Sequence, residues 1–118
     1  MRILFVDDEP KILEGLRRTL RKRRHEWDMH FVDSGAAALE FLADNDCDCI
    51  VSDMRMPEMT GAELLAQVKE RHPQIIRIIL SGHSEVDCVM SAIGVSHQYL
   101  SKPCDADILH DTIGVASS

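Results

Sequence analysis

Five short apolar segments recur along the chain, separated by longer stretches of mixed polarity. They are residues 2–6, 29–32, 49–52, 75–80 and 97–101. Most are continuously apolar rather than alternating, which is typical of strands buried on both faces. The pattern therefore predicts five short strands in a parallel sheet.

Helical patterns fill the stretches between these strands. The first predicted helix begins near Pro10, where a missing backbone N–H is harmless, and carries its leucines on one stripe. The second covers about 35–44 and follows Ser34, a good N-cap residue. The third follows Thr60, has Glu63 three residues later and ends before a proline, so its start has the sequence of a capping box.

Two more helices are predicted in the C-terminal third, at about 84–93 and 105–114. The first of these consists of mediocre helix formers, so packing must stabilise it. Strands that alternate with helices through short loops imply a parallel sheet covered on both faces by right-handed crossovers. We therefore expect residues 1–118 to form a single doubly wound, five-stranded α/β domain.

Composition excludes several classes of protein. A chain of 118 residues can build one hydrophobic core but not two. The formal net charge is −7, and the six basic residues of 17–24 contribute +6, so the remaining residues carry −13. This acidity argues against nucleic acid as the main partner. No apolar segment approaches the ~18 residues of a membrane span or resembles a signal peptide, so we expect a cytoplasmic protein without membrane contact.

The four cysteines lack the spacing of a metal site. They are Cys47, Cys49, Cys88 and Cys104. Because nothing indicates secretion either, we expect reduced thiols in the core rather than disulfides or a zinc centre.

The basic stretch 17–24 has two interpretations. It is either a docking surface for a partner helix or a solvated face whose late charges suit a helix C-terminus. DNA binding is disfavoured, because no recognition helix or interleaved aromatic residues accompany the charge.

Chemistry-bearing residues gather at the predicted carboxyl ends of the strands, where doubly wound sheets bind ligands. Asp7 and Asp8 follow the first strand, Asp53 the third, Ser81 the fourth and Lys102 the fifth. Taken singly, an aspartate, a "SG" or a "KP" after a strand is ordinary turn chemistry. In this order and at these positions, they indicate a shared site.

The residue types at this edge suit a hard divalent cation and a phosphoryl group. Mg²⁺ prefers one or two carboxylates, a backbone carbonyl and water. Lys102 offers a point charge to phosphoryl oxygens, and Ser81 offers a hydroxyl donor. Asp53 stands alone and is the candidate nucleophile, because carboxylates can form acyl phosphates. Asp7 and Asp8 are then the metal-binding pair.

Four motifs, "FVDDEP", "IVSDMRMPEMTGAELL", "IILSGH" and "YLSKPCD", resemble the receiver domain of two-component response regulators, and the resemblance covers nearly the whole chain. It implies a flavodoxin-like (βα)5 fold with strand order 2-1-3-4-5. "DMRMP" and "HQYLSKPCD" are most similar to receivers joined to HD-type output domains, including HDOD and HD-GYP domains.

The resemblance also implies a role for each site residue. Asp53 accepts a phosphoryl group from a phosphohistidine and becomes an aspartyl phosphate. Asp8, Asp53 and the backbone carbonyl of Arg55 bind Mg²⁺ directly, with Mn²⁺ as the alternative ion, and Asp7 acts through water. Lys102 pairs with the phosphoryl oxygens.

Switching is the second implication of the resemblance. Ser81 moves to bind the phosphoryl group, and Tyr99 turns inward with it. This biases the face made of strand 4, helix 4, strand 5 and helix 5. Arg55 and His83 are expected to tune the lifetime of the phosphate.

The implied partners are a sensor histidine kinase or a histidine phosphotransfer protein, and a C-terminal output domain outside this chain. A phosphorylation-dependent homodimer is a further expected assembly. We expect a switch rather than an enzyme, with at most self-phosphorylation from small phosphodonors and self-dephosphorylation.

Other functions for the same residues remain open. An aspartate-nucleophile phosphatase would need a second acid two residues after the nucleophile, where this chain has Arg55. A flavodoxin-like cofactor binder would want a Ser/Thr-rich loop after the first strand, where this chain has "DDEP". A phosphorylation-independent interaction module of the same fold is the third alternative.

Overall fold

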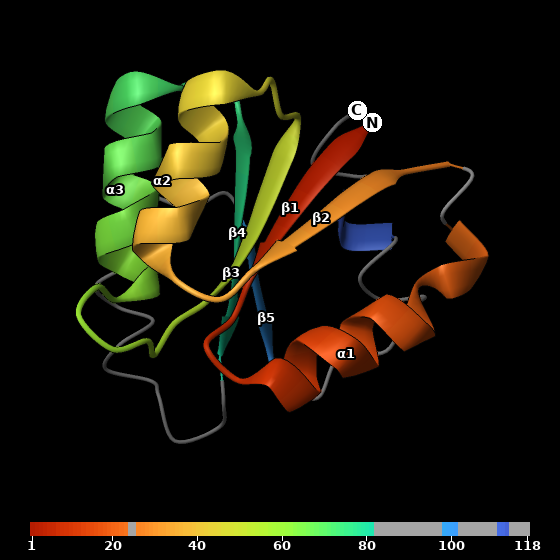
Figure 1. Ribbon diagram of the computed structural model, residues 1–118. Coiled ribbons are helices and arrows are strands. Elements are labelled where there is room, and N and C mark those ends of the chain that lie inside the picture. Colours follow the sequence, from red (N-terminus) through yellow and green to blue (C-terminus); the bar gives the residue numbers. More distant parts are fainter. Residues whose placement is uncertain (24–25, 82–97, 102–110, 114–118) are drawn as a thin grey trace.

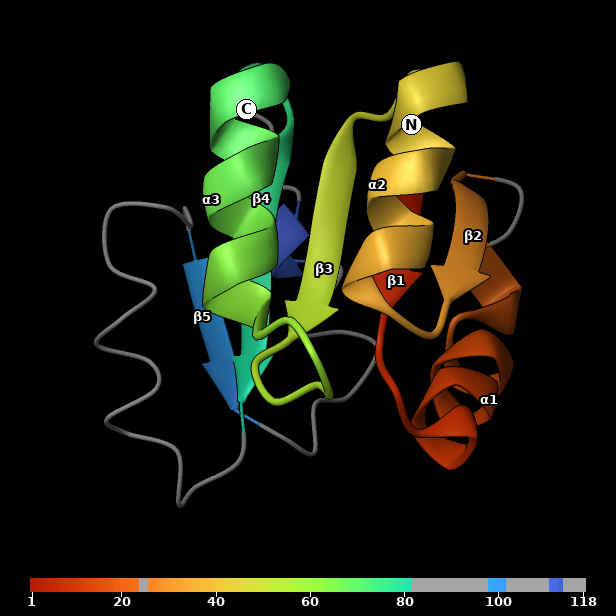
Figure 2. The ribbon, with the colours of Figure 1, turned by 60° about the vertical axis from the view of Figure 1, so that its left-hand side comes forward.

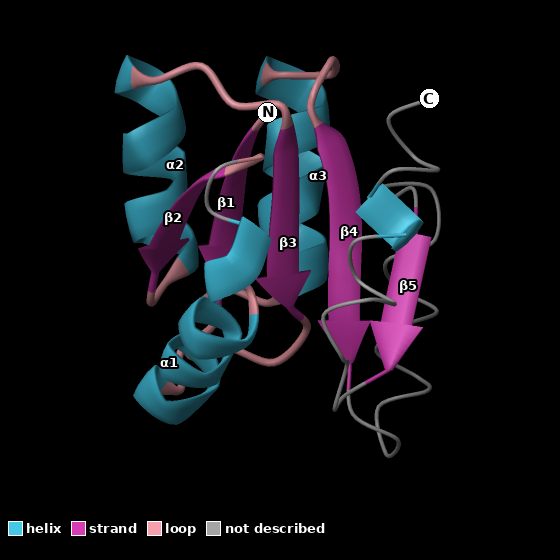
Figure 3. Cartoon of the chain, turned by 90° about the vertical axis from the view of Figure 1, so that its right-hand side faces the viewer, coloured by secondary structure: helices cyan, strands magenta, loops and turns pink. Residues whose placement is uncertain are grey.

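The computed structural model describes residues 1–23, 26–81, 98–101 and 111–113, with only the backbone of Arg23, Ser81 and 98–101. Its centre is a five-stranded parallel sheet in the order β2-β1-β3-β4-β5 (Figure 3). The strands are β1 (Arg2–Val6), β2 (Asp28–Val32), β3 (Cys49–Asp53), β4 (Ile76–Ser81) and β5 (Gln98–Ser101). The predicted doubly wound fold and strand order are confirmed.

Helices cover both faces of this sheet. They are α1 (Pro10–Thr19), the short 3₁₀ turn η1 (Arg21–Arg23), α2 (Gly35–Asp44) and α3 (Gly61–Arg71). Helices α2 and α3 lie side by side on one face and α1 lies on the other (Figures 1 and 2). Of the two C-terminal helices that the sequence predicts, the first lies outside the described residues, and only 111–113 of the second are described, as helix.

The helices begin where the sequence provides caps. The Thr60 hydroxyl accepts a hydrogen bond from the Glu63 N–H (3.1 Å), and the Glu63 carboxylate accepts one from the Thr60 N–H (3.2 Å), so the predicted capping box is formed. The Ser34 hydroxyl caps α2 by accepting the Ala37 N–H (3.1 Å). Each cap satisfies N–H groups that have no partner within the helix.

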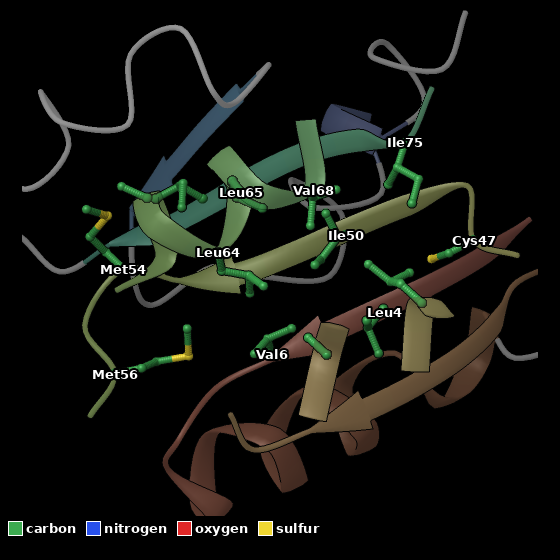
Figure 4. Close-up of a cluster of buried hydrophobic side chains, with 14 residues drawn as sticks. Leu4, Val6, Cys47, Ile50, Met54, Met56, Leu64, Leu65, Val68 and Ile75 are labelled. Atoms are coloured by element: carbon green, nitrogen blue, oxygen red, sulfur yellow. The ribbon is translucent and has the colours of Figure 1, made fainter. Parts of the chain in front are cut away.

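Alternate residues of the strands supply two hydrophobic clusters, one on each face. Leu4 and Ile50 point toward α2 and α3, whereas Ile3 and Val51 point toward α1, as the two-residue period of a strand requires. All four are at most 1% exposed. Figure 4 shows the α2–α3 cluster, in which Leu64, Leu65 and Val68 of α3 pack over β1 and β3.

One buried side chain departs from the apolar pattern of β4. Arg77 lies between isoleucines and is 6% exposed. Its guanidinium donates to the backbone carbonyls of Pro73 (3.3 Å) and Ile75 (3.1 Å), and burial lowers its pKa. The segment 75–80 therefore contains a cation that fastens the loop between α3 and β4.

The described residues bear on the state of the cysteines and on the presence of membrane-spanning helices. Cys47 and Cys49 are buried free thiols, as predicted, and burial raises the pKa of both. Cys88 and Cys104 lie outside the described part. No helix in the described part has the length and hydrophobicity needed to cross a membrane.

The capping box of α3 can be tested by substitution. We expect Thr60→Ala to lower the free energy of unfolding by about 1 kcal/mol, because the Glu63 N–H loses its acceptor. Urea denaturation monitored by circular dichroism measures this change. Thr60→Ser keeps the hydroxyl and should lie within about 0.5 kcal/mol of the native chain; an equal loss in both variants would show that the hydroxyl is not what stabilises the helix.

Candidate functional site

Three carboxylates meet at one edge of the sheet. This is the edge toward which the strand arrows point in Figure 3. Asp7 and Asp8 directly follow β1, and Asp53 is the last residue of β3. Strands β1 and β3 are parallel neighbours whose register ends at Val6 and Ser52, so all three acids emerge at the same edge. One carboxylate oxygen from each lies within 4.8 Å of the other two.

These acids are held in a largely buried setting. Asp7 is 1% exposed and Asp53 is 5% exposed, whereas Asp8 is half-buried. The Asp7 carboxylate accepts the N–H of Glu9 (2.9 Å), and Glu9 in turn is the N-cap residue of α1. Glu9 therefore belongs to the start of the helix, while Asp7 and Asp8 belong to the site.

Mutual repulsion is one electrostatic feature of this group. Two unit charges 4.8 Å apart repel by about 3 to 4 kcal/mol at an effective dielectric near 20. The acids stay close together because their backbone positions are fixed by the sheet. A cation placed among them would remove the repulsion.

The loop from β3 to α3 is fastened against its surroundings. The Gly61 N–H donates to the Met54 carbonyl (2.8 Å), which folds the loop back on the end of β3. A Cβ at Gly35 would lie 2.6 Å from the Met59 sulfur, so Met59 packs directly on the start of α2. Glu58 has φ 70°, the left-handed region, which lets the chain turn between these anchors.

The structure describes only some of the other predicted site residues. Arg55 is exposed and lies two residues after Asp53. Ser81 ends β4 and Tyr99 lies in β5, and the register pairs Ser81 with Ser101, the residue before Lys102. The side chains of Ser81 and Tyr99, and all of His83 and Lys102, lie outside the described part of the chain.

Two residues beside Asp53 received no role from the sequence alone. The Ser52 hydroxyl is fully buried and donates to the Asp53 backbone carbonyl (2.9 Å). A Cβ at Gly61 would overlap that same carbonyl oxygen. A hydroxyl inside an apolar strand and a glycine at the first turn of a helix are both unfavourable in isolation. These two unfavourable residue types are the features of the sequence that could have indicated a role for Ser52 and Gly61.

A surface groove of about 1070 Å³ lies away from the acidic edge, between α1 and β2. Its charged lining contains three arginines and three acids: Glu14, Arg17, Arg18, Arg21, Glu26 and Asp28. Arg17 also lies over the Phe31 ring, 4.7 Å from its centroid. The arginines of the basic stretch 17–24 that line this groove are thus accompanied by an equal number of acids, whereas Asp7, Asp8 and Asp53 lie at the acidic edge.

The donor set at the acidic edge fits a hard divalent cation. All three candidate ligand groups are carboxylates, and Mg²⁺ and Mn²⁺ prefer oxygen ligands. The geometry leaves Asp53 at the centre of the sheet, with the acid pair on one side and β4 on the other. Fold and site together define a doubly wound α/β domain with a cluster of three carboxylates, suited to a divalent cation, at its carboxyl edge.

Comparison with known proteins identifies the family. Residues 3–114 match the response regulator receiver domain, and the chain belongs to this family. It is 36% identical over 113 residues to the hydrogenase transcriptional regulatory protein HoxA of Cupriavidus necator, covering 94% of this chain and 23% of that one. It is 45% identical over 76 residues to the DNA-binding transcriptional regulator NtrC of Escherichia coli K12, covering 64% of this chain and 16% of that one.

A solved structure agrees with this assignment. The signal receiver domain of an HD domain-containing protein from Pseudomonas fluorescens Pf-5 superimposes with a TM-score of 0.90 at 32% identity, covering 98% of this chain and 92% of that one. Receiver domains are phosphoacceptor switches of two-component response regulators, and the family binds Mg²⁺ at an acidic pocket. The chain spans less than a quarter of the length of the curated relatives above.

The repulsion among the acids predicts an unusual effect of neutralising one of them. In the presence of EDTA, Asp8→Asn should raise the free energy of unfolding by about 1 kcal/mol, a value discounted for the exposure of Asp8. Adding Mg²⁺ should then raise the melting temperature of the native chain more than that of the variant. Both effects are measured by thermal unfolding with and without the ion.

Glu40→Gln removes one exposed acid from the middle of α2 and serves as the control. It should change neither the stability in EDTA nor the response to Mg²⁺. A native chain whose melting temperature is indifferent to Mg²⁺ would contradict the metal assignment.

Proposed function

We propose that Asp53 is the phosphoacceptor of this domain and that residues 1–118 act as one receiver. The observation that carries the proposal is the meeting of Asp7, Asp8 and Asp53 within 4.8 Å at the carboxyl edge of the sheet. Asp53 is the central member, because it ends the middle strand of the five. The donor would be the phosphohistidine of a sensor histidine kinase or of a histidine phosphotransfer protein.

The acids have separate tasks in this proposal. Asp8 and Asp53 bind Mg²⁺ directly together with the backbone carbonyl of Arg55, and Asp7 acts through a water molecule; Mn²⁺ would serve in the same place. The bound ion supplies positive charge that offsets the repulsion among the carboxylates and the charge of the incoming phosphoryl group. The burial of Asp7 and Asp53 supports these roles, because charge interactions strengthen where water is excluded.

The chemical step is an in-line displacement at phosphorus. A carboxylate oxygen of Asp53 forms a P–O bond, the P–N bond to the donor histidine breaks, and its electron pair stays on the imidazole nitrogen. Lys102 then pairs with the phosphoryl oxygens and Ser81 donates a hydrogen bond to one of them. The protein contributes position and charge rather than further covalent chemistry.

Switching would pass through the β4–β5 side of the sheet. The register places Ser81 opposite Ser101 and Tyr99 opposite Ile79, so the two proposed switch residues lie on adjacent, hydrogen-bonded strands. Movement of Ser81 toward the phosphoryl group and of Tyr99 inward would change the face made of strand 4, helix 4, strand 5 and helix 5. That face would control an output domain, for which we propose an HD-type domain. It would alternatively control a phosphorylation-dependent homodimer.

The proposed function also implies where the domain acts and which reactions it carries out. The domain would act in the cytoplasm, contacting neither nucleic acid nor membrane directly. It would turn over no separate substrate, beyond self-phosphorylation from small phosphodonors and self-dephosphorylation. The basic stretch 17–24 would be a solvated face, with a docking surface for the phosphodonor as the alternative.

Phosphorylation with a small donor tests the proposal and separates its rivals. Incubation with acetyl phosphate and Mg²⁺ should add one phosphoryl mass, seen by intact-protein mass spectrometry, and Asp53→Asn should abolish it. Asp48→Asn, in which an exposed acid before the same strand is neutralised, should label like the native chain. A native chain that gains no mass would leave the phosphorylation-independent interaction module as the better description.

Arg55 is proposed to tune how long the phosphate persists, together with His83. Its exposed side chain stands two residues after Asp53, where it can screen the phosphoryl group from attacking water. We expect Arg55→Ala to shorten the lifetime of the aspartyl phosphate by about threefold or more. Loss of the phosphoryl mass with time measures this rate.

Arg71→Ala removes the same charge from the C-terminus of α3 and is the matched control. Its dephosphorylation rate should equal that of the native chain. Equal rates in all three proteins would eliminate the tuning role of Arg55.

A further inference from the structure

We propose that Ser52 is a positioning residue for the phosphoacceptor, an inference that rests on the proposed role of Asp53. Its hydroxyl is fully buried and donates a 2.9 Å hydrogen bond to the backbone carbonyl of Asp53. In this role it does not act on the ligand carboxylates or on the phosphodonor directly. It acts by fixing the peptide from which the Asp53 side chain projects.

The need for such a residue follows from the register of the sheet. Pairing between β1 and β3 ends at Val6 and Ser52, while pairing between β3 and β4 continues to Asp53 and Leu80. Beyond Val6, the Asp7 N–H donates to Val32 of β2 (3.2 Å). Asp53 therefore lies one residue past the β1 ladder, at the point where support from that side stops.

Ser52 and Leu80 together hold both ends of one peptide group. The peptide that joins Asp53 to Met54 has its C=O bonded to the Ser52 hydroxyl and its N–H bonded to the Leu80 carbonyl (3.1 Å). With both ends held, this peptide cannot rotate without breaking a buried hydrogen bond. The same restraint holds the backbone from which the Asp53 side chain projects.

The start of α3 closes over the same peptide. A Cβ at Gly61 would overlap the Asp53 carbonyl oxygen and lie 3.0 Å from the Met54 Cα. The Gly61 N–H donates to the Met54 carbonyl (2.8 Å). The peptide that follows Met54 is therefore also held by a hydrogen bond. Met54 itself packs among Leu64 and Leu65 of α3 (Figure 4).

Ser52 would be unfavourable as a core residue without its hydrogen bond to the Asp53 carbonyl. It lies two residues after Ile50 on the face that α2 and α3 cover, where the neighbouring side chains are apolar. Burying a hydroxyl there is favourable only if the hydroxyl is hydrogen-bonded. The consequence is a carboxylate held in place for the cation and for attack on phosphorus.

The test compares four proteins: the native chain, Ser52→Ala, Ser52→Thr and Ile50→Val. The rate of labelling by acetyl phosphate is measured against donor concentration at saturating Mg²⁺, and Mg²⁺ affinity is measured by calorimetry. We expect Ser52→Ala to lower the maximal labelling rate by about tenfold with little change in the half-saturating donor concentration, because misplacement of a reacting group affects the chemical step. Its Mg²⁺ affinity should fall by about threefold or more.

Two variants separate positioning from stability. Ser52→Thr retains the hydroxyl and should keep the rate within about twofold of the native chain. Ile50→Val shortens a buried neighbour on the same strand and destabilises the fold without reaching Asp53, so its rate and Mg²⁺ affinity should be native. If Ser52→Ala does not fold, Ser52→Cys provides a weaker donor of similar size and should show an intermediate loss.

The outcomes distinguish this inference from the function on which it rests. Native rate and native Mg²⁺ affinity in Ser52→Ala, or in Ser52→Cys, would overturn the positioning role. So would equal losses in Ser52→Ala and Ile50→Val, because that result would reflect stability alone. A native chain that binds Mg²⁺ but is not labelled would contradict the proposed phosphoacceptor, while the calorimetry would still decide whether Ser52 orders the carboxylate.

Discussion

The parallel pairing of β1 with β3 is the constraint on which the rest of this structure depends. The two strands are neighbours and run in the same direction, so their carboxyl ends lie at one edge of the sheet. Asp53 meets Asp7 and Asp8 there although it is distant from them in the sequence. The packing of the domain must hold these three like charges together, and the arrangement that results suits a cation.

The hydrophobic clusters provide the stability that this arrangement requires. Each face of the sheet has its own cluster, and the strands between them are buried on both sides. Fixed caps at Ser34 and Thr60 set where α2 and α3 begin, and these two starts flank the loop that follows Asp53. Burial of apolar side chains thus determines the backbone, and the backbone determines how close the carboxylates lie.

The phosphoacceptor and the strand proposed to respond to it are direct neighbours. Asp53 and its backbone partners are held by hydrogen bonds, including the bond from the Met54 N–H to the Leu80 carbonyl. Leu80 precedes Ser81, so the phosphoacceptor strand is joined directly to the strand proposed to respond. A change at the phosphoryl group would therefore reach β4 through one hydrogen-bonded neighbour rather than through a long path.

The sequence by itself determined the five strands, the starts of α2 and α3, and the gathering of Asp7, Asp8 and Asp53, because periodicity, caps and the strand-end rule are local or topological signals. The strand order came from resemblance, since periodicity carries no information on which strands are neighbours. Only the tertiary structure decided the bond from Ser52 to the Asp53 carbonyl, the approach of Gly61 to that oxygen and the burial of Arg77. Each of these features depends on where separate segments meet or on the direction of one carbonyl. The pattern of hydrophobic residues carries no information about either property.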